Sequence, residues 1–456
     1  MTAPASGTEY VALDRDSVIR VVTDNPALAA VTGDGALQAL EIGDGNLNQV
    51  FVLSSLPEPH RTIVVKQALP YLRVAGEGWP LTRERMRFET ESLRLYNRLV
   101  PDLAPLVYDH DHEQSWVAME CLDQHRVMRL GVIDGDLPQG IGGDLGRFMA
   151  TLVYSTSEMS LTAPAKKAQS VRFSNPELCQ LQEQFVYTNP FFDSPENICN
   201  PLLADDIRQV RTDGALKQAI ALAKSQYMDH SQALLHGDLH TGSVMVHTGD
   251  PSSGDGDRPA TVSPATVSPA TVSRVIDPEF AFYGPVGYDV GTLLANLAIG
   301  ALAQQVLLDH PARERSQAQL VDIMETSWRV FVHHIVRLWT PESGGDMASA
   351  SFWGGDMDGF ARFRDGVLVG IAGDAGRHGG CELLRRCMGI VSVADLQAIA
   401  DLSVRARVER ALLALARRWL LDSTPPSTAA ALSAVHWLID PVRQLLAADL
   451  DPGVLA

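Results

Sequence analysis

Two short stretches decide the class of fold: residues 236–243 read His-Gly-Asp-Leu-His-Thr-Gly-Ser, and residues 276–279 read Ile-Asp-Pro-Glu. Each follows an apolar run typical of a β-strand, so its carboxylates are expected just beyond a strand end. Phosphoryl transfer needs one carboxylate for the attacking hydroxyl and oxygen ligands that hold Mg²⁺ on the nucleotide phosphates. The pattern therefore predicts Asp238 in the first role. Asp277 and Glu279 are predicted in the second, because carboxylates two residues apart point the same way in an extended segment.

Length and composition allow a large protein with a substantial core. The chain has 456 residues, 46% of them hydrophobic, with a net charge of −18 and a pI near 5.1. This charge argues against nucleic acid or an anionic membrane as the main partner, since binding there depends on phosphate neutralisation by Lys and Arg. The N-terminus lacks a leader pattern, and no apolar run reaches the roughly 18 residues of a membrane span. The five cysteines are scattered, so a reduced, cytoplasmic compartment is predicted.

The order of the predicted elements indicates two unequal parts. Strands are expected at 39–42, 50–53, 62–67, 106–109 and 116–119, with a helix at 84–100. Later helices are expected at 145–154, 213–228, 290–308, 320–338, 383–389, 408–421 and 429–446. The prediction is an α+β, bilobal fold: a small antiparallel-sheet lobe at 1–121, with short helices before its first strand, and a large, mainly helical lobe at 122–456.

A low-complexity segment interrupts the second part. Residues 259–273 contain Pro-Ala-Thr-Val-Ser three times, after a polar, glycine-rich run. Proline at every fifth position blocks a regular ladder, so residues 249–273 are predicted to form a flexible surface loop. The loop would interrupt a hairpin between 243–246 and 274–276, at little cost because loop-closure entropy grows slowly with length. A docking motif is the alternative interpretation.

A glycine turn and a lysine precede the acidic stretches. Residues 43–48 read Gly-Asp-Gly-Asn-Leu-Asn, where the backbone could approach a phosphate closely, although an ordinary hairpin turn has the same pattern. Lys66 ends the following strand, where it would reach the α and β phosphates. A helix glutamate usually holds such a lysine, and Glu89 and Glu91 are the candidates. Glu89 is favoured because Leu93 lies one turn later on the expected core face.

Three further polar residues surround the Asp238 stretch. His236 is predicted to support the loop backbone, whereas the pattern leaves the role of His240 open. Asp289 lies near the start of a predicted helix, where a carboxylate would cap the helix or brace the loops. We therefore expect Asp289 to be structural.

In this order the motifs resemble the protein-kinase-like fold, and in particular the small-molecule kinases related to aminoglycoside phosphotransferases and choline kinases. Two departures narrow the match. Ser243 stands where these enzymes usually carry a metal-binding Asn, and Asp-Pro-Glu at 277–279 stands where they usually carry Asp-Phe-Gly. The resemblance to methylthioribose kinase rests on both acidic stretches, the glycine turn and the runs at 66–80, 175–179, 277–285 and 383–389. It covers roughly residues 8–422, without the insertion at 249–273.

The resemblance implies ATP- and Mg²⁺-dependent phosphorylation of the anomeric 1-hydroxyl of 5-methylthioribose. The product would be 5-methylthioribose 1-phosphate, an intermediate of methionine salvage. Asp238 would face the sugar as the base or hydroxyl-orienting residue. Asp277 and Glu279 would hold Mg²⁺, with Glu279 compensating for the Asn that is absent at Ser243.

The resemblance also assigns residues on both sides of the transferred phosphate. The nucleotide side comprises Gly43, Gly45, Asn46, Asn48, Lys66, Glu89 and a hinge of Met119, Glu120 and Cys121 that reads adenine through its backbone. On the sugar side, Trp79 would help to close the site, and the pair Arg385 and Arg386 would hold ribose hydroxyls. Adjacent helical residues point about 100° apart, so one arginine at a time is expected to face the substrate. The family is commonly homodimeric.

Two other interpretations remain. A related kinase would act on another sugar or an amino alcohol, as aminoglycoside, choline and homoserine kinases do, and the run at 277–285 together with Ser243 argues against it. A non-catalytic nucleotide-binding protein would have lost a working part. Lys66, Asp238, Asp277 and Glu279 are all present, which favours an enzyme.

Overall fold

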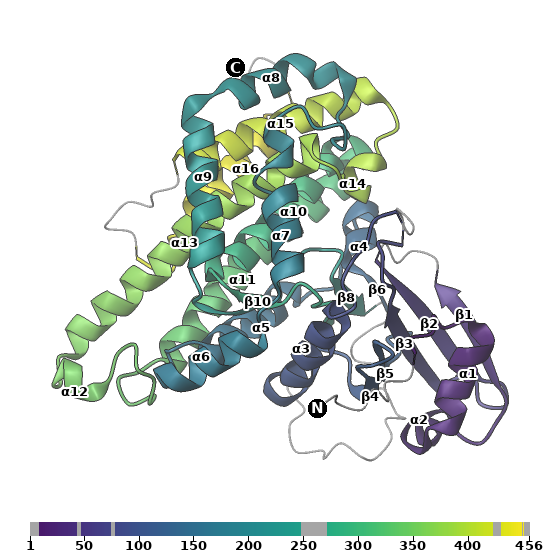
Figure 1. The fold of residues 1–456 in the computed structure, drawn as a ribbon. Helices are drawn as coiled ribbons and strands as arrows, with labels where there is room; N and C mark the ends of the chain where they lie inside the picture. The colour runs from purple at the N-terminus through teal and green to yellow at the C-terminus, as the bar shows by residue number, and fades with distance from the viewer. Residues whose placement is uncertain are drawn as a thin grey trace, which may run out of the picture. The chain divides into compact units, whose positions relative to one another are not determined.

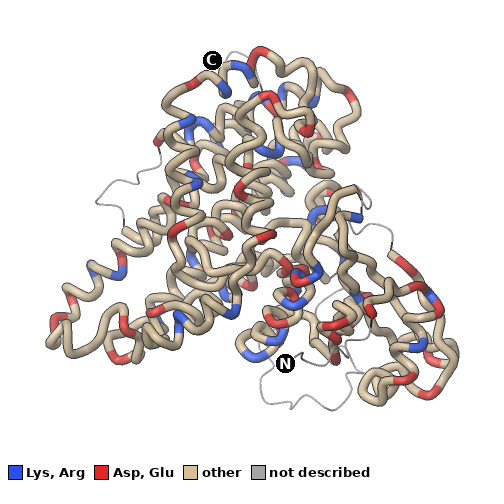
Figure 2. The backbone as a smooth tube through the Cα atoms, in the orientation of Figure 1, with Lys and Arg blue, Asp and Glu red and all other residues tan. Residues whose placement is uncertain are grey.

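The computed structural model describes residues 9–42, 47–73, 78–247, 271–422, 430–448 and 450. These residues form two compact units, one within Met1–Asp123 and Val275–Ala281, the other within Gln124–Arg274 and Phe282–Ala456. The first unit contains an antiparallel sheet, and helices dominate the second (Figure 1). The predicted α+β class is therefore confirmed. Acidic and basic residues are interspersed along both units (Figure 2).

The first unit is built on a five-stranded antiparallel sheet in the order β1-β2-β3-β5-β4. Its strands are β1 (Leu37–Ile42), β2 (Asn48–Ser55), β3 (Thr62–Ala68), β4 (Val107–Asp111) and β5 (Trp116–Glu120). The register places Lys66 on β3 between Val50 of β2 and Val117 of β5. Because side chains alternate along a strand, Lys66 and Val65 point to opposite faces of the sheet.

Two short helices pack against the Val65 face. Asp14 caps α1 (Arg15–Asp24) in a reciprocal pair of bonds with Ser17, and Pro26 begins α2 (Pro26–Thr32) with a φ suited to a first helical turn. The core between these helices and the sheet includes the buried side chains of Val18, Val22, Leu28, Phe51, Leu53, Ile63 and Val65. Helix α3 (Arg85–Leu99) also contacts β3 and carries Glu89 to Lys66.

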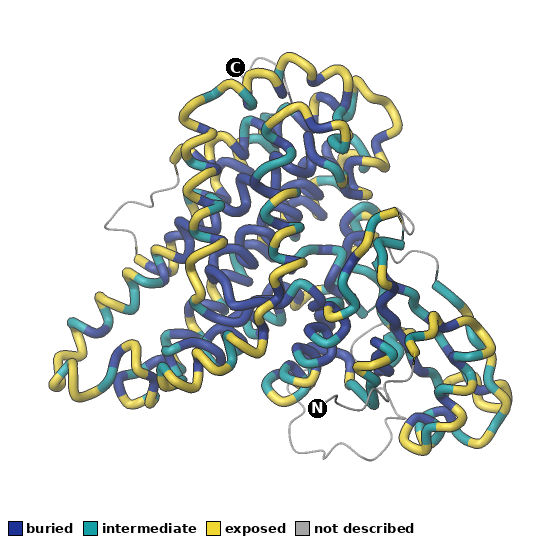
Figure 3. Tube along the Cα trace, in the orientation of Figure 1, coloured by how far each residue is buried: buried dark blue, intermediate teal, exposed yellow. Residues whose placement is uncertain are grey.

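The second unit is centred on α10 (Val286–Leu307) and α13 (Met357–Met388), and nearly every residue of α10 is buried (Figure 3). The other long helices are α5 (Ile141–Thr156), α9 (Gly214–Asp229), α11 (His310–Leu338), α15 (Leu402–Leu421) and α16 (His436–Ala447). Shorter helices are α4 (Met128–Asp134), α6 (Ala163–Arg172), α7 (Pro176–Phe185), α8 (Ala204–Thr212), α12 (Ala350–Trp353) and α14 (Ala394–Gln397).

Glycines let α10 and α13 approach closely. A Cβ on Gly291 would lie 2.3 Å from the carbonyl oxygen of Ala375, and one on Gly379 would lie 2.9 Å from the carbonyl oxygen of Gly291. Each glycine destabilises a helix by roughly 1 kcal/mol relative to alanine. The glycines before residue 383 therefore disfavour a helix by local propensity, and a helix was predicted only at 383–389. Helix α13 instead begins at Met357, because close packing against α10 outweighs the local propensity.

Helix α10 is long and apolar enough, by length and composition, to cross a membrane, with a mean hydropathy of 1.5. The sequence predicted no such stretch, and that prediction was wrong because Asp289 and Asn296 interrupt the apolar run without lowering its average enough. Within the protein, 89% of this window is buried. Helix α10 is therefore the core helix of the second unit, and its composition does not indicate a membrane protein.

Short strands carry the chain into the two acidic stretches, as predicted. Strand β7 (Ala233–Leu235) precedes Asp238 and pairs with β10 (Phe282–Gly284). Strands β6 (His125–Val127), β8 (Val244–His247) and β9 (Ser273–Val275) form a three-stranded sheet in which β8 and β9 are neighbours. The predicted hairpin is therefore confirmed, while the insertion between its strands lies largely outside the described residues.

Candidate active site

Lys66 is held between two carboxylates in the first unit. Its Nζ lies 2.9 Å from Oε1 and 2.8 Å from Oε2 of Glu89, and it also forms an ion pair with Asp277. Glu91 instead forms an ion pair with Arg87, at 3.6 Å. Burial would lower the pKa of Lys66, but the charges of Asp277 and Glu89 outweigh burial and raise it. Lys66 therefore keeps its positive charge at the sheet.

The backbone at Asp277 is in the left-handed region, with a φ of 64°. Non-glycine residues rarely adopt this conformation, and its strain is typical of functional sites. Residues 277–279 are therefore not extended throughout, which was the condition under which the two carboxylates would point the same way. Carboxylate oxygens of Asp277 and Glu279 nevertheless converge with one of Glu89, all within 4.8 Å of one another.

Glu279 is buried in a polar pocket of the first unit. Its Oε2 accepts a hydrogen bond of 2.8 Å from Asn48 Nδ2 and lies 3.5 Å from Arg85 Nε. Arg85 Nε also donates to Asn48 Oδ1 over 2.9 Å. Burial and the charge of Asp277 raise the pKa of Glu279, whereas Lys66 and Arg85 lower it. Asn48 and Arg85 therefore fix the carboxylate of Glu279.

The donor set of Glu89, Asp277 and Glu279 suits Mg²⁺, because this cation prefers hard oxygen ligands. Lys66 pairs with both Glu89 and Asp277, while Asn48 and Arg85 contact Glu279, so all three carboxylates also have polar partners within the protein. The residues present thus fit the predicted cation. Gly43, Gly45 and Asn46 of the glycine turn lie outside the described residues.

The predicted hinge residues lie at the end of β5, and Trp79 lies between β3 and α3. Met119 and Glu120 end β5, and Cys121 follows. The Glu120 amide donates to the carbonyl of Leu106 over 2.8 Å, so this amide is already used within the sheet. Trp79 is half-buried, and its carbonyl accepts a bond of 2.9 Å from the Leu72 amide.

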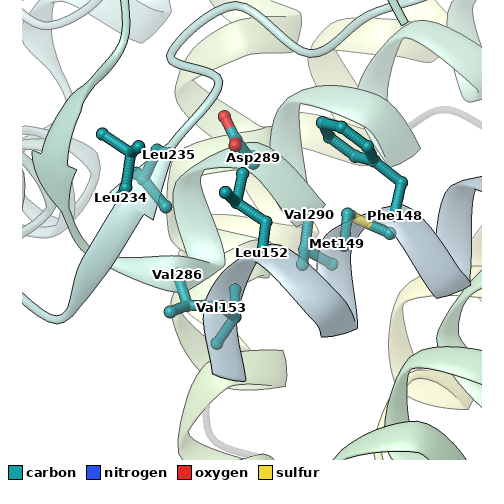
Figure 4. A pocket seen from close by; sticks show the side chains of 9 residues that line it. All are labelled: Phe148, Met149, Leu152, Val153, Leu234, Leu235, Val286, Asp289 and Val290. Atoms are coloured by element: carbon teal, nitrogen blue, oxygen red, sulfur yellow. The ribbon is translucent and has the colours of Figure 1, made fainter. Parts of the chain in front are cut away.

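In the second unit, Asp289 supports the loop that carries Asp238. The amides of His236 and Gly237 donate to Asp289 over 2.7 and 3.1 Å, and the Asp238 amide donates to His236 Nδ1 over 3.2 Å. Figure 4 shows Asp289 beside a small apolar cavity of about 10 Å³ between α5, β7 and α10. Burial raises the pKa of Asp289 to about 7, against the opposing effect of the two amide bonds. The predicted bracing by Asp289 and His236 is confirmed.

Asp238 is flanked by a histidine and an arginine. Its Oδ2 lies 3.3 Å from His240 Nε2, and its Oδ1 lies 3.9 Å from Arg385 Nη2. Burial would raise the pKa of Asp238, but His240, Arg385 and Arg386 lower it well below its usual range. Among the described residues, Oδ1 has no hydrogen-bond partner. A buried acceptor of this kind is ready to receive a hydrogen bond from a substrate hydroxyl.

The bonds of His240 define its tautomer. Its Nδ1 accepts from the amides of Gly242 and Ser243 over 2.9 and 3.1 Å, so in the neutral ring the proton lies on Nε2 and faces Asp238. The hydroxyl of Ser243 accepts from the His240 amide over 2.9 Å and donates to the Asp238 carbonyl over 2.8 Å. Ser243 therefore closes the loop with the hydroxyl that stands in the place of the usual metal-binding Asn.

The two arginines predicted to face the sugar lie on α13, and both are bound by one carboxylate that the sequence did not indicate. Arg385 and Arg386 are buried, and each forms an ion pair with Glu382, at 2.7 Å for Arg386 Nε. Glu382 stands three and four residues before them, a spacing that brings side chains together on a helix. That spacing was the only available signal, and it does not distinguish a buried carboxylate from a surface one.

These two groups of residues define a kinase that transfers phosphate to an alcohol group. Residues 39–254 match the model of the phosphotransferase enzyme family. The methylthioribose kinase of Bacillus cereus is 34% identical over 83% of this chain and 85% of its own length. That of Yersinia enterocolitica is 34% identical over 91% of this chain and 93% of its own length. The chain therefore belongs to the methylthioribose kinase family, as predicted.

A solved structure gives a weaker similarity. The crystal structure of choline kinase from Cryptosporidium parvum aligns with a TM-score of 0.39 and 12% identity, over 96% of this chain and 98% of that one.

Proposed function

We propose that this protein phosphorylates the anomeric 1-hydroxyl of 5-methylthioribose with ATP, giving 5-methylthioribose 1-phosphate for methionine salvage. The observation that carries the proposal is Oδ1 of Asp238, which pairs with Arg385 but accepts no hydrogen bond from the described residues, in a chain 34% identical to methylthioribose kinases over most of its length. The alternative is a related kinase that acts on another sugar or an amino alcohol.

Asp238 acts on the acceptor hydroxyl. Because the neighbouring cations keep it ionised, Oδ1 accepts the hydrogen bond of the hydroxyl and aims its oxygen at the transferred phosphorus. The transition state of phosphoryl transfer is loose, so orientation matters more than early removal of the proton. Oδ1 receives that proton as the new bond forms.

Arg385 and Arg386 supply the positive charge on the acceptor side. A guanidinium offers several donors in a fixed plane, which suits neighbouring ribose hydroxyls and the oxygens of the moving phosphoryl group. Arg385, which approaches Asp238, is the better placed of the two. Trp79 helps to close the acceptor site.

On the nucleotide side, Lys66 binds the phosphates and Glu89 holds it in place. Asp277 and Glu279 hold Mg²⁺, which neutralises charge on the phosphates when it is bound. The glycine turn with Gly43, Gly45 and Asn46 supplies amides to the phosphates, and Asn48 orients Glu279. Met119, Glu120 and Cys121 form the adenine hinge.

The chain is organised as a two-lobed kinase. Residues 1–121 and 122–456 act as the two lobes of the kinase, with the insertion at 249–273 as a passive loop. The enzyme is a cytoplasmic homodimer whose partners are ATP and a small sugar.

Steady-state assays with a panel of acceptors test the activity. The expected result is a kcat/KM for 5-methylthioribose far above those for ribose, choline, homoserine and an aminoglycoside. Equal or better turnover of another acceptor contradicts the proposed substrate. Phosphate that appears at a position other than the 1-hydroxyl contradicts the proposed chemistry.

A further inference from the structure

Glu382 is the centre of a buried ionic network in the second unit. Its side chain is 1% exposed, and it binds Arg385 and Arg386 through separate contacts. Asn296 of α10 also donates to Glu382 Oε1, over 3.0 Å. One carboxylate thus accepts hydrogen bonds from four donor atoms on three side chains, which leaves both guanidiniums little freedom to rotate.

The network continues through Asn296 to a third arginine. Asn296 Oδ1 accepts a bond of 3.0 Å from Arg129 Nη2 on α4. Arg129 Nη1 donates to Asp395 of α14 over 2.6 Å. Asp395 is fully buried and Arg129 nearly so, so this part of the network also lies in the interior.

Both ends of the network touch the loop that carries Asp238. Arg385 approaches Oδ1 of Asp238, and the backbone amide of Arg129 donates to the carbonyl of Thr241 over 2.9 Å. A Cβ added to Gly242 would lie 3.4 Å from Arg129 Nε. Helices α4 and α13 therefore both contact the loop that carries Asp238, and a continuous set of polar contacts connects the two helices.

The charges within the network are balanced. Three cations, Arg129, Arg385 and Arg386, face three anions, Asp238, Glu382 and Asp395. A buried charge without a partner costs free energy. When one charged residue of the network is removed, the remaining side chains therefore move to find new partners. Neutralising Glu382 would leave two adjacent, mutually repelling guanidiniums next to Asp238.

We propose that Glu382 is a positioning residue that fixes both acceptor-side arginines relative to Asp238 and, through Asn296 and Arg129, to the rest of the catalytic loop. The proposal rests on the roles given to Arg385 and Asp238 in the proposed function. It adds that the arginine pair acts as one preorganised unit, because both members share a single anchor. Misplaced guanidiniums weaken acceptor binding and transition-state stabilisation together.

A double-mutant cycle tests this inference. Arg385→Ala is expected to reduce kcat/KM for the acceptor, and Glu382→Gln to reduce it by about 10- to 100-fold through the same arginines. In the double variant the two losses do not fully multiply, because the part of the Glu382→Gln loss that acts through Arg385 is already absent and only the part that acts through Arg386 remains. The KM for ATP changes by less than about twofold, since the nucleotide residues lie elsewhere in the chain. If the two losses multiply, the inference is overturned while the proposed function stands.

A matched control separates positioning from general loss of packing. Glu409 is also a buried glutamate, on α15, and it accepts a bond of 2.8 Å from Asn200 outside the network. Glu409→Gln is expected to lower the melting temperature without raising the KM for the acceptor. A rise as large as that of Glu382→Gln overturns the inference.

Two further outcomes keep the test decisive. Glu382→Asp keeps the charge on a shorter side chain, so it should recover part of the activity, and it replaces Glu382→Gln in the cycle if the latter does not fold. Failure of Glu382→Asp to exceed Glu382→Gln in folded, active protein overturns the inference. If Arg385→Ala and Arg386→Ala both leave the acceptor kinetics unchanged, the proposed role of the arginines in acceptor binding is wrong. The inference, which depends on that role, is then overturned with it.

Discussion

Arg85 and Glu279 form an ion pair in the interior of the first unit, with 3.5 Å between Arg85 Nε and Glu279 Oε2. The exposed fractions of their side chains are 0% and 1%. Burial raises the pKa of Glu279, and the positive charge of Arg85 opposes this rise. Together with Lys66, Arg85 therefore limits the protonation of a proposed Mg²⁺ ligand whose pKa burial raises to about 7.

Arg85→Met is expected to raise the pKa of Glu279 further above about 7, so that a larger fraction of this carboxylate holds a proton near neutral pH. Because only the ionised carboxylate binds Mg²⁺ well, the half-saturating Mg²⁺ concentration should rise by about tenfold or more. The defect should shrink as the pH increases and Glu279 loses its proton. Measuring kcat as a function of Mg²⁺ at several pH values tests this, and a defect that is independent of pH contradicts it.

Arg87→Met is the matched control for Arg85. Arg87 lies on the same helix but is partly exposed, and it pairs with Glu84 over 2.7 Å and with Glu91 over 3.6 Å. Exposed pairs contribute little, typically below about 1 kcal/mol. We expect its Mg²⁺ dependence to match that of the unaltered protein.

The contrast between Glu89 and Glu91 gives a second prediction. Glu89→Gln removes the charge that anchors Lys66, leaving it with Asp277, and the KM for ATP should rise by about tenfold while kcat falls. Glu91→Gln, two residues along the same helix, should leave both constants unchanged. Equal effects of the two substitutions would contradict the assignment of Glu89.

The sequence predicted the residues whose position along a strand or loop is itself a signal. Lys66 lies near the end of an apolar strand, Asp238 follows another, and Asp289 lies in the first turn of a helix, so local patterns place each of them. Arg85 and Glu382 were missed because each stands among other charged residues, as an exposed side chain would. Their burial follows from contacts with residues far away in the chain, which local periodicity does not encode.

Distant contacts also explain why α13 is much longer than the helix predicted at 383–389. Glycines at 373, 376, 379 and 380 indicate a broken helix by propensity alone. The packing shows what three of them do. Gly376 faces Trp437 of α16, Gly379 faces Gly291 of α10 and Trp419 of α15, and Gly380 faces Leu420 of α15, so these groups occupy the space of the absent side chains. Glycines that indicate a helix break by local propensity are here required for close packing of a continuous helix.

This packing predicts that Gly291→Ala destabilises the protein. The added Cβ would lie 2.3 Å from the Ala375 carbonyl oxygen, so the helices must separate, at a cost of about 1–3 kcal/mol. Gly370→Ala on α13 is the control, because its Cβ would meet no atom within 4 Å. That change should be neutral or stabilise the helix by up to about 1 kcal/mol. Thermal unfolding measures both, and a smaller loss for Gly291→Ala than for Gly370→Ala contradicts the packing argument.

Asp238→Asn is expected to lower kcat by about 10²–10⁴-fold with little change in the KM for ATP, because the amide cannot accept the proton of the acceptor hydroxyl. The pKa of Asp238 is lowered, so its ionisation should not produce an acid limb near neutral pH in the kcat profile of the unaltered enzyme. Near-normal turnover by the folded variant would refute the assigned role.

Substitutions of Ser243 test whether its hydroxyl stabilises the loop that carries Asp238 or binds the cation. Its hydroxyl closes the turn between Asp238 and His240, so Ser243→Ala should loosen Asp238 and lower kcat by roughly tenfold. If Asp277 and Glu279 hold the cation, the half-saturating Mg²⁺ concentration should stay the same. Ser243→Asn restores a polar side chain but is too large for the two bonds of the hydroxyl, so its kcat should fall as well. An altered Mg²⁺ requirement in Ser243→Ala would instead identify the hydroxyl as a ligand of the cation.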